Sequence, residues 1–470
     1  MSVSNELRDN SVSFIGSMMM GVAGSAPASS IAMGTAALIG AAGVFAPIAL
    51  LIFAVPMLGI AKAYQALGAR DASAGASYQW TSVIFGKFLG FFSGWSLLVA
   101  TLLFMVSGTV PIATATLNLI APGQVGNVVT TSMVASFWFA AVSVIVVAGI
   151  TVTSRAQTML TLAQLLILVV ILAAALMHIN GTGATEKFGK QWLGSGLTWD
   201  SFAATALIAV YFYWGWDVTS NLGEETVGGG REAGLGGLLS ILITILLYSG
   251  FAAVALLMFP VRDAQNLTDN LIFNIANRSG LSSVGGVLAS IAVILSSIAA
   301  LEATMLMFSR TLFAMGRDGS MPRMFGKVDE RTQSPSRAIY AVIVLGLALI
   351  WGSALMPSVQ LLLFASVRAL GFQVDYYFGL AGLAAAWIFR DCYKTSIRKW
   401  LALCVFPAAS SIMFIGLGLY AVSTFDRWTN VIGIGSFALG LGFVWLCFRT
   451  DAETVESGVK SHECGVIGQG

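Results

Sequence analysis

The sequence predicts an all-α polytopic membrane protein with about 12 transmembrane helices, each needing roughly 20 apolar residues to cross the hydrocarbon core. Three observations lead to this fold class. Hydrophobic residues make up 57% of the chain and charged residues only 10%, whereas a soluble domain carries about 25% charged residues. Apolar runs of spanning length recur along nearly the whole chain. Two of these runs are interrupted, near residues 18–30 and 213–221.

The apolar runs define the expected membrane-spanning segments. They cover approximately 11–38, 43–66, 85–118, 131–150, 154–178, 203–226, 233–260, 283–312, 337–355, 359–389, 400–422 and 429–448. The third and tenth runs are long, which indicates tilt or protrusion rather than additional spans. The N-terminus has no basic region followed by a cleavage site, so we expect the first run to be retained rather than removed as a signal peptide.

Lysine and arginine in the short loops set the expected orientation. These residues are abundant between segments eight and nine and between ten and eleven. Loops 119–130 and 356–358 contain none, and loop 423–428 contains one. Loop 179–202 has two lysines and is a mild exception. The pattern predicts a multi-pass protein of the cell membrane with both termini in the cytoplasm.

The interrupted runs are the first and the sixth, and this placement predicts an inverted repeat. Five spans per unit is an odd number, so the second unit is inverted relative to the first, about an axis in the membrane plane. The expected organisation is a cytoplasmic N-terminus (1–10), a first repeat (11–178, helices 1–5), a second repeat (203–389, helices 6–10), two additional helices (400–448) and a cytoplasmic tail (449–470).

Several functional classes are excluded by composition and residue pattern. The formal net charge of +2 gives no electrostatic basis for binding nucleic acid. No Cys/His cluster has metal-ligand spacing, and no Ser/His/Asp set or phosphate-binding loop indicates an enzyme. We expect no cofactor and no metal. The expected partners are a small-molecule substrate, a coupling ion and the lipid bilayer.

The first interruption is expected to bind an anion through its backbone. Gly21 and Gly24 weaken the helix, and Pro27 cannot donate a helical hydrogen bond. The N–H groups of Gly24, Ser25 and Ala26 should then lack helical partners. They would lie at the positive end of the following half-helix, where they could hold a carboxylate. The alternative is that glycine and proline are simply common in membrane helices.

The second interruption is expected to bind a cation. The carbonyls of Tyr211, Tyr213 and Trp214 would end a half-helix just before Gly215, and this negative end suits an ammonium group. Asp217 could bind a substrate cation or take up a proton. Together the two interruptions offer complementary ends for the zwitterion of an α-amino acid. For each aromatic residue the alternative is helix packing or an interfacial belt.

Ionisable residues inside the spans are costly and are therefore candidates for coupling or gating. Asp217 and Glu302 could carry a coupled proton, although Glu302 could instead be a structural, hydrogen-bonded acid. Arg368 and Asp375 lie seven residues apart and hence on one helical face. They could form an internal ion-pair network or reach a neighbouring helix, and either arrangement could have a gating role. Ser297 could contribute a hydroxyl to a sodium site.

Several motifs resemble those of the amino acid–polyamine–organocation permease superfamily. The strongest is Ser309-Arg-Thr-Leu-Phe-Ala-Met-Gly-Arg-Asp-Gly-Ser-Met-Pro322, followed by Ser334-Pro-Ser-Arg-Ala338. The others are Gly215-Trp-Asp with Glu224-Glu-Thr226, Ala74-Gly-Ala-Ser-Tyr78, and Gly24-Ser-Ala in the first interruption. Their spacing is consistent with the family over most of residues 10–340.

The resemblance implies a LeuT-like fold, with a five-plus-five inverted repeat and broken helices 1 and 6, that works by alternating access. It implies that the first-helix backbone binds the substrate carboxylate, that sixth-helix carbonyls bind the amine, and that Tyr211 is an aromatic gate. Gln164 stands nearest the position where some members carry a lysine in place of a sodium ion, which leaves the coupling ion open. Ser25-Ala-Pro-Ala replaces the second glycine pair of many members.

These observations predict a secondary active transporter that imports an amino acid across the cytoplasmic membrane. Proton coupling is the leading expectation, because Asp217 and Glu302 could be titrated, and sodium is the alternative ion. Three other functions stay open: import of a polyamine or amine, exchange of amino acids, and sensing of an amino acid without transport.

Overall fold

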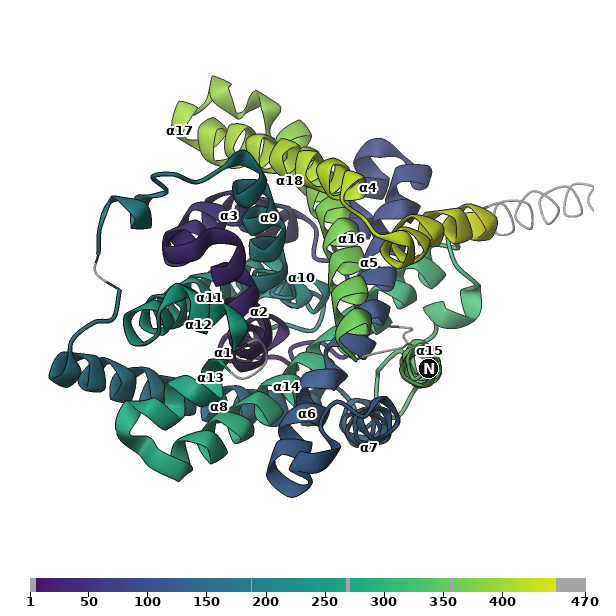
Figure 1. Ribbon diagram of the computed structural model, residues 1–470. Coiled ribbons are helices and arrows are strands. Elements are labelled where there is room, and N and C mark those ends of the chain that lie inside the picture. The colour runs from purple at the N-terminus through teal and green to yellow at the C-terminus, as the bar shows by residue number, and fades with distance from the viewer. Residues whose placement is uncertain (1–5, 187, 268–270, 356–358, 445–470) are drawn as a thin grey trace, which may run out of the picture.

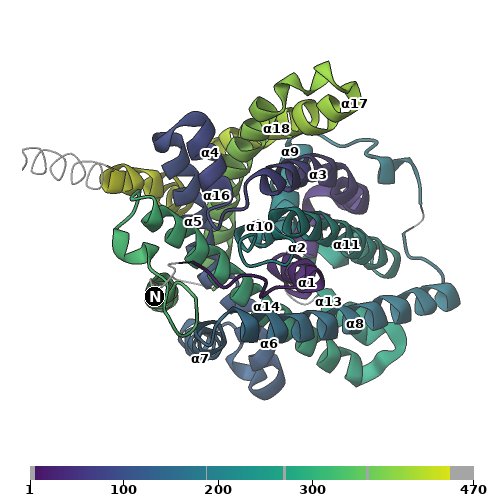
Figure 2. The same ribbon diagram turned by 180° about the vertical axis from the view of Figure 1, so that it is seen from behind.

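The computed structural model describes residues 6–186, 188–267, 271–355 and 359–444 as a bundle of helices (Figures 1 and 2). Across these ranges there is no β-strand, and a single parallel bridge joins Val12 to Thr226. The all-α class is therefore confirmed. The predicted tail, 449–470, lies outside the described residues.

The helices follow the apolar runs of the sequence. Their bounds are α1 (Phe14–Gly24), α2 (Pro27–Ala42), α3 (Ala46–Arg70), α4 (Ser77–Phe85), α5 (Lys87–Ser107), α6 (Thr109–Ile120), α7 (Val128–Val147), α8 (Ile150–Thr182), α9 (Trp199–Phe212), α10 (Val218–Asn221), α11 (Gly229–Met258), α12 (Val261–Asn266), α13 (Leu271–Ala276), α14 (Ser282–Arg317), α15 (Ser336–Ser353), α16 (Val359–Ile388), α17 (Ile397–Trp400) and α18 (Phe406–Ser423). A further helix covers 427–444. Short turns join them, among them η5 (Asn277–Leu281) and η6 (Arg323–Gly326).

Among the described residues, eight helical runs are long and apolar enough to cross a membrane. They are Phe14–Arg70, Lys87–Ile120, Val128–Val147, Ile150–Thr182, Gly229–Met258, Val284–Arg317, Ser336–Ser353 and Ile397–Ser423. The first of them contains α1, α2 and α3 in succession. The chain is thus a polytopic membrane protein, and the count of about 12 spans stays a prediction.

Both predicted interruptions are present. Two residues separate α1 from α2, and one of them, Ala26, has left-handed backbone angles (φ 49°, ψ 56°), which are uncommon for a residue with a Cβ. Pro27 then begins α2, at a position where the missing N–H removes no helical bond. Residues 213–217 separate α9 from α10, and within them Gly215 has φ 97°.

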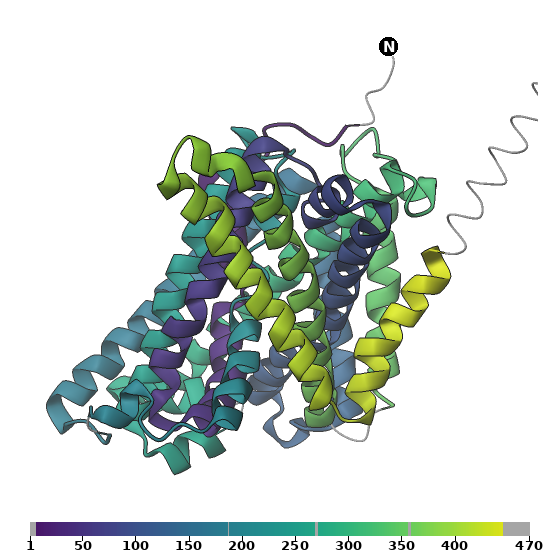
Figure 3. The ribbon, with the colours of Figure 1, turned by 90° about the horizontal axis from the view of Figure 1, so that it is seen from above.

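The interrupted helices lie inside the bundle. α1, α10 and α11 contact one another near its centre, and α2 packs on α9 and α11 (Figures 1 and 2). α14 packs along α8, α5 and α6, and α16 packs along α18 and α5. In the view of Figure 3, the first described residues, 6–13, and the connection after α14 lie at the same end of the bundle. We call this the N-terminal end.

Glycines on α16 allow it to approach α18 closely. A Cβ built on Gly382 would collide with Oγ of Ser411 and would lie 2.9 Å from Cδ1 of Ile60 on α3. A Cβ on Gly379 would lie 2.5 Å from Cγ1 of Ile415. Small residues at helix interfaces let backbones pack closely where no hydrophobic effect drives association. We call the contacts of Gly379 and Gly382 with Ile60, Ser411 and Ile415 the glycine seam, which holds α16 against α18 and α3.

Replacing Gly382 by alanine should therefore destabilise the protein by about 1–3 kcal/mol, the usual cost of overpacking. Gly371→Ala, on the same helix, is the matched control, because nothing lies within 4 Å of a Cβ built there. Alanine is the better helix former by up to about 1 kcal/mol, so this variant should be as stable as the wild type or more so. Melting temperatures of the purified proteins in detergent measure both effects. Equal melting temperatures for the two variants would show that the seam is not tight.

Candidate functional site

The two helix interruptions lie against each other, backbone to backbone. A Cβ built on Gly24 would collide with the carbonyl oxygen of Gly215, and a Cβ built on Gly215 would collide with that of Gly24. Both residues are buried, and Gly215 in addition has a positive φ. Only glycine satisfies these constraints without strain. The structure thus brings the two predicted interruptions together.

The N–H groups at the first interruption differ from the expectation. The amide of Ser25 donates to the carbonyl of Gly21 (3.4 Å), and the amide of Ala26 donates to that of Ala23 (2.9 Å). The prediction that these two amides lack helical partners is wrong. The reason is that the chain leaves the helix over only two residues, so the bonds of a last turn persist.

The amides without backbone partners lie slightly later, and α14 caps them. The N–H groups of Ala28 and Ser29 donate to Oγ of Ser296 at 3.2 and 3.4 Å. Oγ of Ser29 lies 2.7 Å from Oγ of Ser297, and it also donates to the carbonyl of Val293 at 3.4 Å. First-turn amides have no partner inside their own helix, so this serine cluster replaces it. Ser297 therefore lies at the start of α2.

Tyrosine hydroxyls fix both interruptions to neighbouring helices. The carbonyl of Ser25 accepts hydrogen bonds from the hydroxyl of Tyr248 on α11 (2.5 Å) and from Oγ of Ser30 (3.0 Å). The hydroxyl of Tyr213 donates to the carbonyl of Leu50 on α3 (2.9 Å). The rings of Tyr213 and Tyr248 lie 5.9 Å apart. Each interruption is thus tied to a neighbouring helix through a tyrosine hydroxyl.

Two backbone carbonyls at the second interruption are unoccupied. The carbonyl of Tyr211 accepts from the N–H of Trp214 at 3.4 Å. Within the described part of the chain, no hydrogen bond reaches the carbonyl oxygens of Tyr213 and Trp214. Tyr213 and Trp214 are buried, whereas Tyr211 is half-buried. Of the three predicted acceptors, two are therefore available to a ligand.

Asp217 is fully buried and has a partner for only one of its oxygens. Its Oδ2 accepts from the hydroxyl of Tyr377 on α16 (2.9 Å), and that hydroxyl accepts from Nε1 of Trp214 (2.7 Å). No described residue donates to Oδ1. Trp216 and Tyr64, whose ring centroids lie 5.2 Å apart, are buried too, and their polar side-chain atoms have no partner among the described residues. The site therefore holds unused hydrogen-bonding capacity.

Two further predicted residues lie on the helices that surround the interruptions. Glu302 on α14 is fully buried, and both of its carboxylate oxygens lack partners among the described residues. Gln164 on α8 is equally buried, and both atoms of its amide lack partners there too. α8 and α14 pack against each other and against α1. No hydrogen bond links either residue to Asp217 in the described structure.

The internal ion pair between Arg368 and Asp375, the first of the two alternatives, is not formed. Arg368 is exposed and donates to the carbonyl (2.6 Å) and Oγ1 (2.9 Å) of Thr424, beyond the end of α18. Asp375 is buried against Gly418 of α18, with both oxygens unpartnered in the described structure. Although the two residues share a helical face, Arg368 reaches a backbone acceptor at the helix end.

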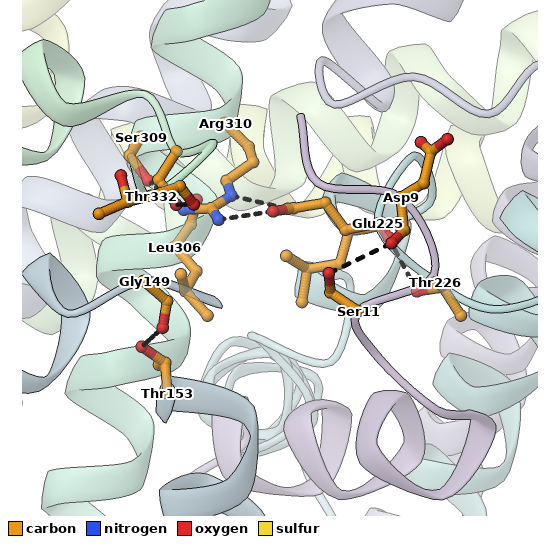
Figure 4. A network of polar contacts seen from close by, with 12 residues as sticks. Asp9, Ser11, Gly149, Thr153, Glu225, Thr226, Leu306, Ser309, Arg310 and Thr332 are labelled. Atoms are coloured by element: carbon orange, nitrogen blue, oxygen red, sulfur yellow. Dashed lines mark hydrogen bonds and ion pairs between the residues drawn. The ribbon is translucent and has the colours of Figure 1, made fainter. Parts of the chain in front are cut away.

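A buried ion pair lies at the N-terminal end of the bundle (Figure 4). Nε and Nη2 of Arg310 each lie 2.9 Å from a carboxylate oxygen of Glu225, and these side chains are only 1% and 0% exposed. Nη1 of Arg310 donates to Oγ of Ser309 (3.1 Å). The amides of Ser11 and Val12 donate to the backbone carbonyl of Glu225 at 2.9 and 3.0 Å. The N-terminal segment, the loop after α10 and α14 are thus joined.

A second, more exposed pair lies beside the first. Nη2 of Arg317 lies 3.0 Å from Oε1 of Glu224, which also accepts from the amide of Ala74 at 2.8 Å. Burial, together with the nearby Glu224 carboxylate, raises the pKa of Asp71 in the connection between α3 and α4. The guanidinium groups of Arg317 and Arg70 act in the opposite direction and lower the pKa of Asp71.

The sequence analysis missed Tyr377 and the pair of Arg310 and Glu225 as site residues. Arg310 had a detectable signal, because it is a cation close to the end of an apolar segment, and such residues are functional candidates. Glu225 follows the second interruption closely. Tyr377 had no signal, since nothing in the sequence indicates that its hydroxyl meets Asp217.

Comparison with known proteins adds the family. Residues 10–447 match the family model described as "Amino acid permease". Branched-chain amino acid permease BcaP of Bacillus subtilis is 22% identical over 310 residues, which cover 61% of this chain and 63% of that protein. Cationic amino acid transporter 4, vacuolar, of Arabidopsis thaliana is 25% identical over 310 residues, or 61% of this chain and 49% of that protein.

An uncharacterised transporter of Mycobacterium tuberculosis is 26% identical over 338 residues, which cover 68% of this chain and 72% of that protein. The alignments with the Bacillus and Arabidopsis proteins cover less than two thirds of those proteins' own length. The family model and these relatives are named as permeases and transporters.

The buried pair predicts a specific stability pattern. Arg310→Met should cost about 3–5 kcal/mol, because it leaves the Glu225 carboxylate buried without its cation. The double variant Arg310→Met/Glu225→Leu should recover most of that loss, since it removes both charges. Arg317→Met is the control, because its partly exposed pair contributes about 1 kcal/mol or less. Melting temperatures in detergent report the differences. A double variant no more stable than Arg310→Met alone would contradict the burial argument.

Proposed function

The chain belongs to the amino acid permease family, within the amino acid–polyamine–organocation superfamily, and from this premise we propose that it is a secondary active transporter. In this proposal it imports an amino acid across the cell membrane by alternating access, coupled to protons. The observation that carries the proposal is the contact between the two helix interruptions at Gly24 and Gly215. Non-helical backbone is tolerated at membrane depth only where it faces protein, water or a ligand. Discontinuous helices that meet are typical of transporter substrate sites.

The proposed topology has about 12 spans, with both termini in the cytoplasm. The eight apolar runs and the distribution of lysine and arginine support it. The proposed inverted repeat comprises residues 11–178 and 203–389, followed by two additional helices within 400–448. Its support is that α1 with α2 and α9 with α10 are the interrupted pairs and occupy the first position of each unit.

The proposed substrate site uses groups of both interruptions. The ammonium group would be held by the carbonyls of Tyr213 and Trp214 and by Oδ1 of Asp217, since these acceptors have no donor in the described structure. The carboxylate would be held at the positive end of α2, where it would displace Oγ of Ser296 from the amides of Ala28 and Ser29. Tyr211, half-buried beside this site, is the proposed aromatic gate. Gly21, Ser25 and Ala26 would shape the turn that faces the carboxylate.

Alternating access requires a closed end that can open. In the proposed cycle, the pair of Arg310 and Glu225 keeps the N-terminal end closed, with the backbone of Ser11 and Val12 bound to Glu225. This arrangement joins the loop after α10 to α14. Opening toward the cytoplasm would have to separate these groups, so the pair is proposed as part of the gate.

Import of an amine is the second candidate function, and Asp217 is the observation that favours it. An unpartnered carboxylate oxygen in the site suits a cationic substrate, with or without a carboxylate of its own. The relatives are named for branched-chain and for cationic amino acids, so their names do not indicate which side chain the substrate of this protein carries.

Uptake by the purified protein in proteoliposomes tests the proposal. The labelled panel consists of neutral, acidic and basic amino acids together with putrescine, measured with and without an inward proton gradient and at varied external sodium. Accumulation of an amino acid that depends on the gradient and not on sodium is the expected result. Uptake of putrescine alone would move the function to amine import. Uptake only into preloaded vesicles would indicate an exchanger, and binding without flux a sensor.

Tyr377→Phe tests the proposed role of the second interruption. The variant removes the donor to Asp217 and the acceptor for Trp214. Hydrogen bonds to charged groups contribute about 1.5–3 kcal/mol. Since about 1.4 kcal/mol corresponds to a factor of ten, the uptake rate at low substrate concentration should fall by roughly tenfold or more. Tyr340→Phe is the matched control, because Tyr340 is exposed on α15, and its uptake should equal that of the wild type. If uptake by the Tyr377→Phe protein equals that of the wild type, the hydrogen bond from this hydroxyl to Asp217 does not contribute to substrate binding.

A further inference from the structure

Glu302 occupies an unusual position for an acid. It lies on α14 beyond the serine cluster that caps α2, its side chain is fully buried, and neither carboxylate oxygen has a partner among the described residues. A buried, ionised and unpaired carboxylate carries a large desolvation cost. A carboxyl group that holds a proton avoids most of this cost and becomes a hydrogen-bond donor.

Gln157 on α8 contacts α14 one turn before Glu302 and has a free acceptor there among the described residues. Its Nε2 donates to the backbone carbonyl of Ala299 at 2.7 Å, and its Oε1 has no partner in the described structure. A carbonyl oxygen can only accept, so the amide atom that faces Ala299 must be the nitrogen. The orientation of the Gln157 amide is thereby fixed, with its oxygen left as a free acceptor.

The direction of side chains on a helix indicates where Glu302 lies relative to this acceptor. Helical side chains lean toward the N-terminus and cover the turn that precedes their own Cα. Ala299 lies three residues before Glu302, so the Glu302 carboxyl covers the turn to which Gln157 binds. An ionised carboxylate and the Gln157 oxygen would both be acceptors and would repel each other. A protonated carboxyl can donate to that oxygen.

Few charges surround this position. The titratable or charged groups on the elements that pack against α14, and on α14 itself, are Arg155 and His178 (α8), Lys87 (α5), Arg337 and Tyr340 (α15), Tyr78 (α4), Arg278 (η5), Arg323 (η6), Asp217 (before α10), and Arg310 and Arg317 (α14). Arg310 and Arg317 are paired with Glu225 and Glu224. No ion pair with Glu302 occurs in the described ranges. An ionised Glu302 carboxylate therefore has no cation partner among the described residues.

We propose that Glu302 and Gln157 form a proton-binding site between α8 and α14. The proton adds to one carboxylate oxygen of Glu302, and Gln157 is the positioning residue that accepts its hydrogen bond. On release of the proton the two groups become repelling acceptors, which loosens α8 from α14. The inference rests on the proposed function, because it assigns the coupled proton to specific groups. The site lies five residues along α14 from Ser297, which contacts the start of α2.

Two transport modes in proteoliposomes separate the proton step from substrate binding. Counterflow exchanges labelled for unlabelled substrate and needs no net proton movement, whereas accumulation driven by a proton gradient does. Glu302→Gln mimics the protonated acid, so it should keep counterflow within about twofold of the wild type and lose gradient-driven accumulation. Gln157→Leu removes the acceptor of the proton-bearing form. Its pH midpoint for accumulation should move toward acid by about one unit, since one hydrogen bond of about 1 kcal/mol corresponds to roughly one pH unit.

Gln373→Leu is the matched control for Gln157→Leu. Gln373 on α16 is also fully buried, donates Nε2 to a backbone carbonyl (Gly433, 2.9 Å) and leaves its Oε1 unpartnered in the described structure. Its substitution should leave the pH midpoint unchanged. Melting temperatures and counterflow show that each variant is folded.

The inference is overturned if Glu302→Gln still accumulates substrate with the gradient, or if both glutamine variants shift the pH midpoint equally. If the Gln157 variant does not fold, Gln157→Asn, which keeps the amide but shortens its reach, takes its place with the same expected acid shift. Failure of the proposed function has a different signature, because the wild type itself would then show neither counterflow nor accumulation of any amino acid.

Discussion

Backbone groups that leave a helix cannot face hydrocarbon, and this constraint explains how the centre of the molecule is built. The interruptions at Gly24 and Gly215 satisfy it by packing against each other, which only residues without a Cβ permit. Side chains from neighbouring helices meet several of the remaining groups, whereas the carbonyls of Tyr213 and Trp214 have no donor among the described residues. Ser296 takes the amides that begin α2, and Tyr248 takes the carbonyl of Ser25. The serine cluster and the tyrosine hydroxyls are consequences of the two breaks.

Some buried polar groups of the bundle have all their hydrogen-bond partners and others do not. This difference distinguishes groups that stabilise the structure from groups that could bind a proton or a substrate. At the N-terminal end, Arg310 and Glu225 meet through two hydrogen bonds and leave no charge unpaired. Near the interruptions, Asp217 has one free oxygen, and Glu302 has two within the described residues. A fully paired ion bridge holds one arrangement, whereas free acceptors can bind a proton or a substrate ammonium group. The paired Arg310 and Glu225 therefore suit a gate, and the free acceptors of Asp217 and Glu302 suit a binding site.

Much of the architecture could be predicted from the sequence, because length and apolar pattern are local properties. The segments, both interruptions and the permease family followed from runs of residues and from motifs such as that beginning at Ser309. Contacts between helices could not be predicted. The hydroxyl of Tyr377 on Asp217 and the pairing of Arg310 with Glu225 depend on tertiary packing that no spacing encodes. The expected pair of Arg368 with Asp375 failed for the same reason, since a shared helical face does not exclude a closer acceptor elsewhere.

The central claim is that the two interruptions together form a substrate site that opens and closes. Alkylation of a single cysteine tests it most directly, using Ser25→Cys in a protein whose native cysteines are replaced by serine. Ser25 is only 3% exposed, so a hydrophilic thiol reagent can reach it only when the site opens. The account predicts slow alkylation that the transported amino acid inhibits and a non-transported one does not. A rate that no amino acid changes, under conditions where uptake proceeds, would contradict it.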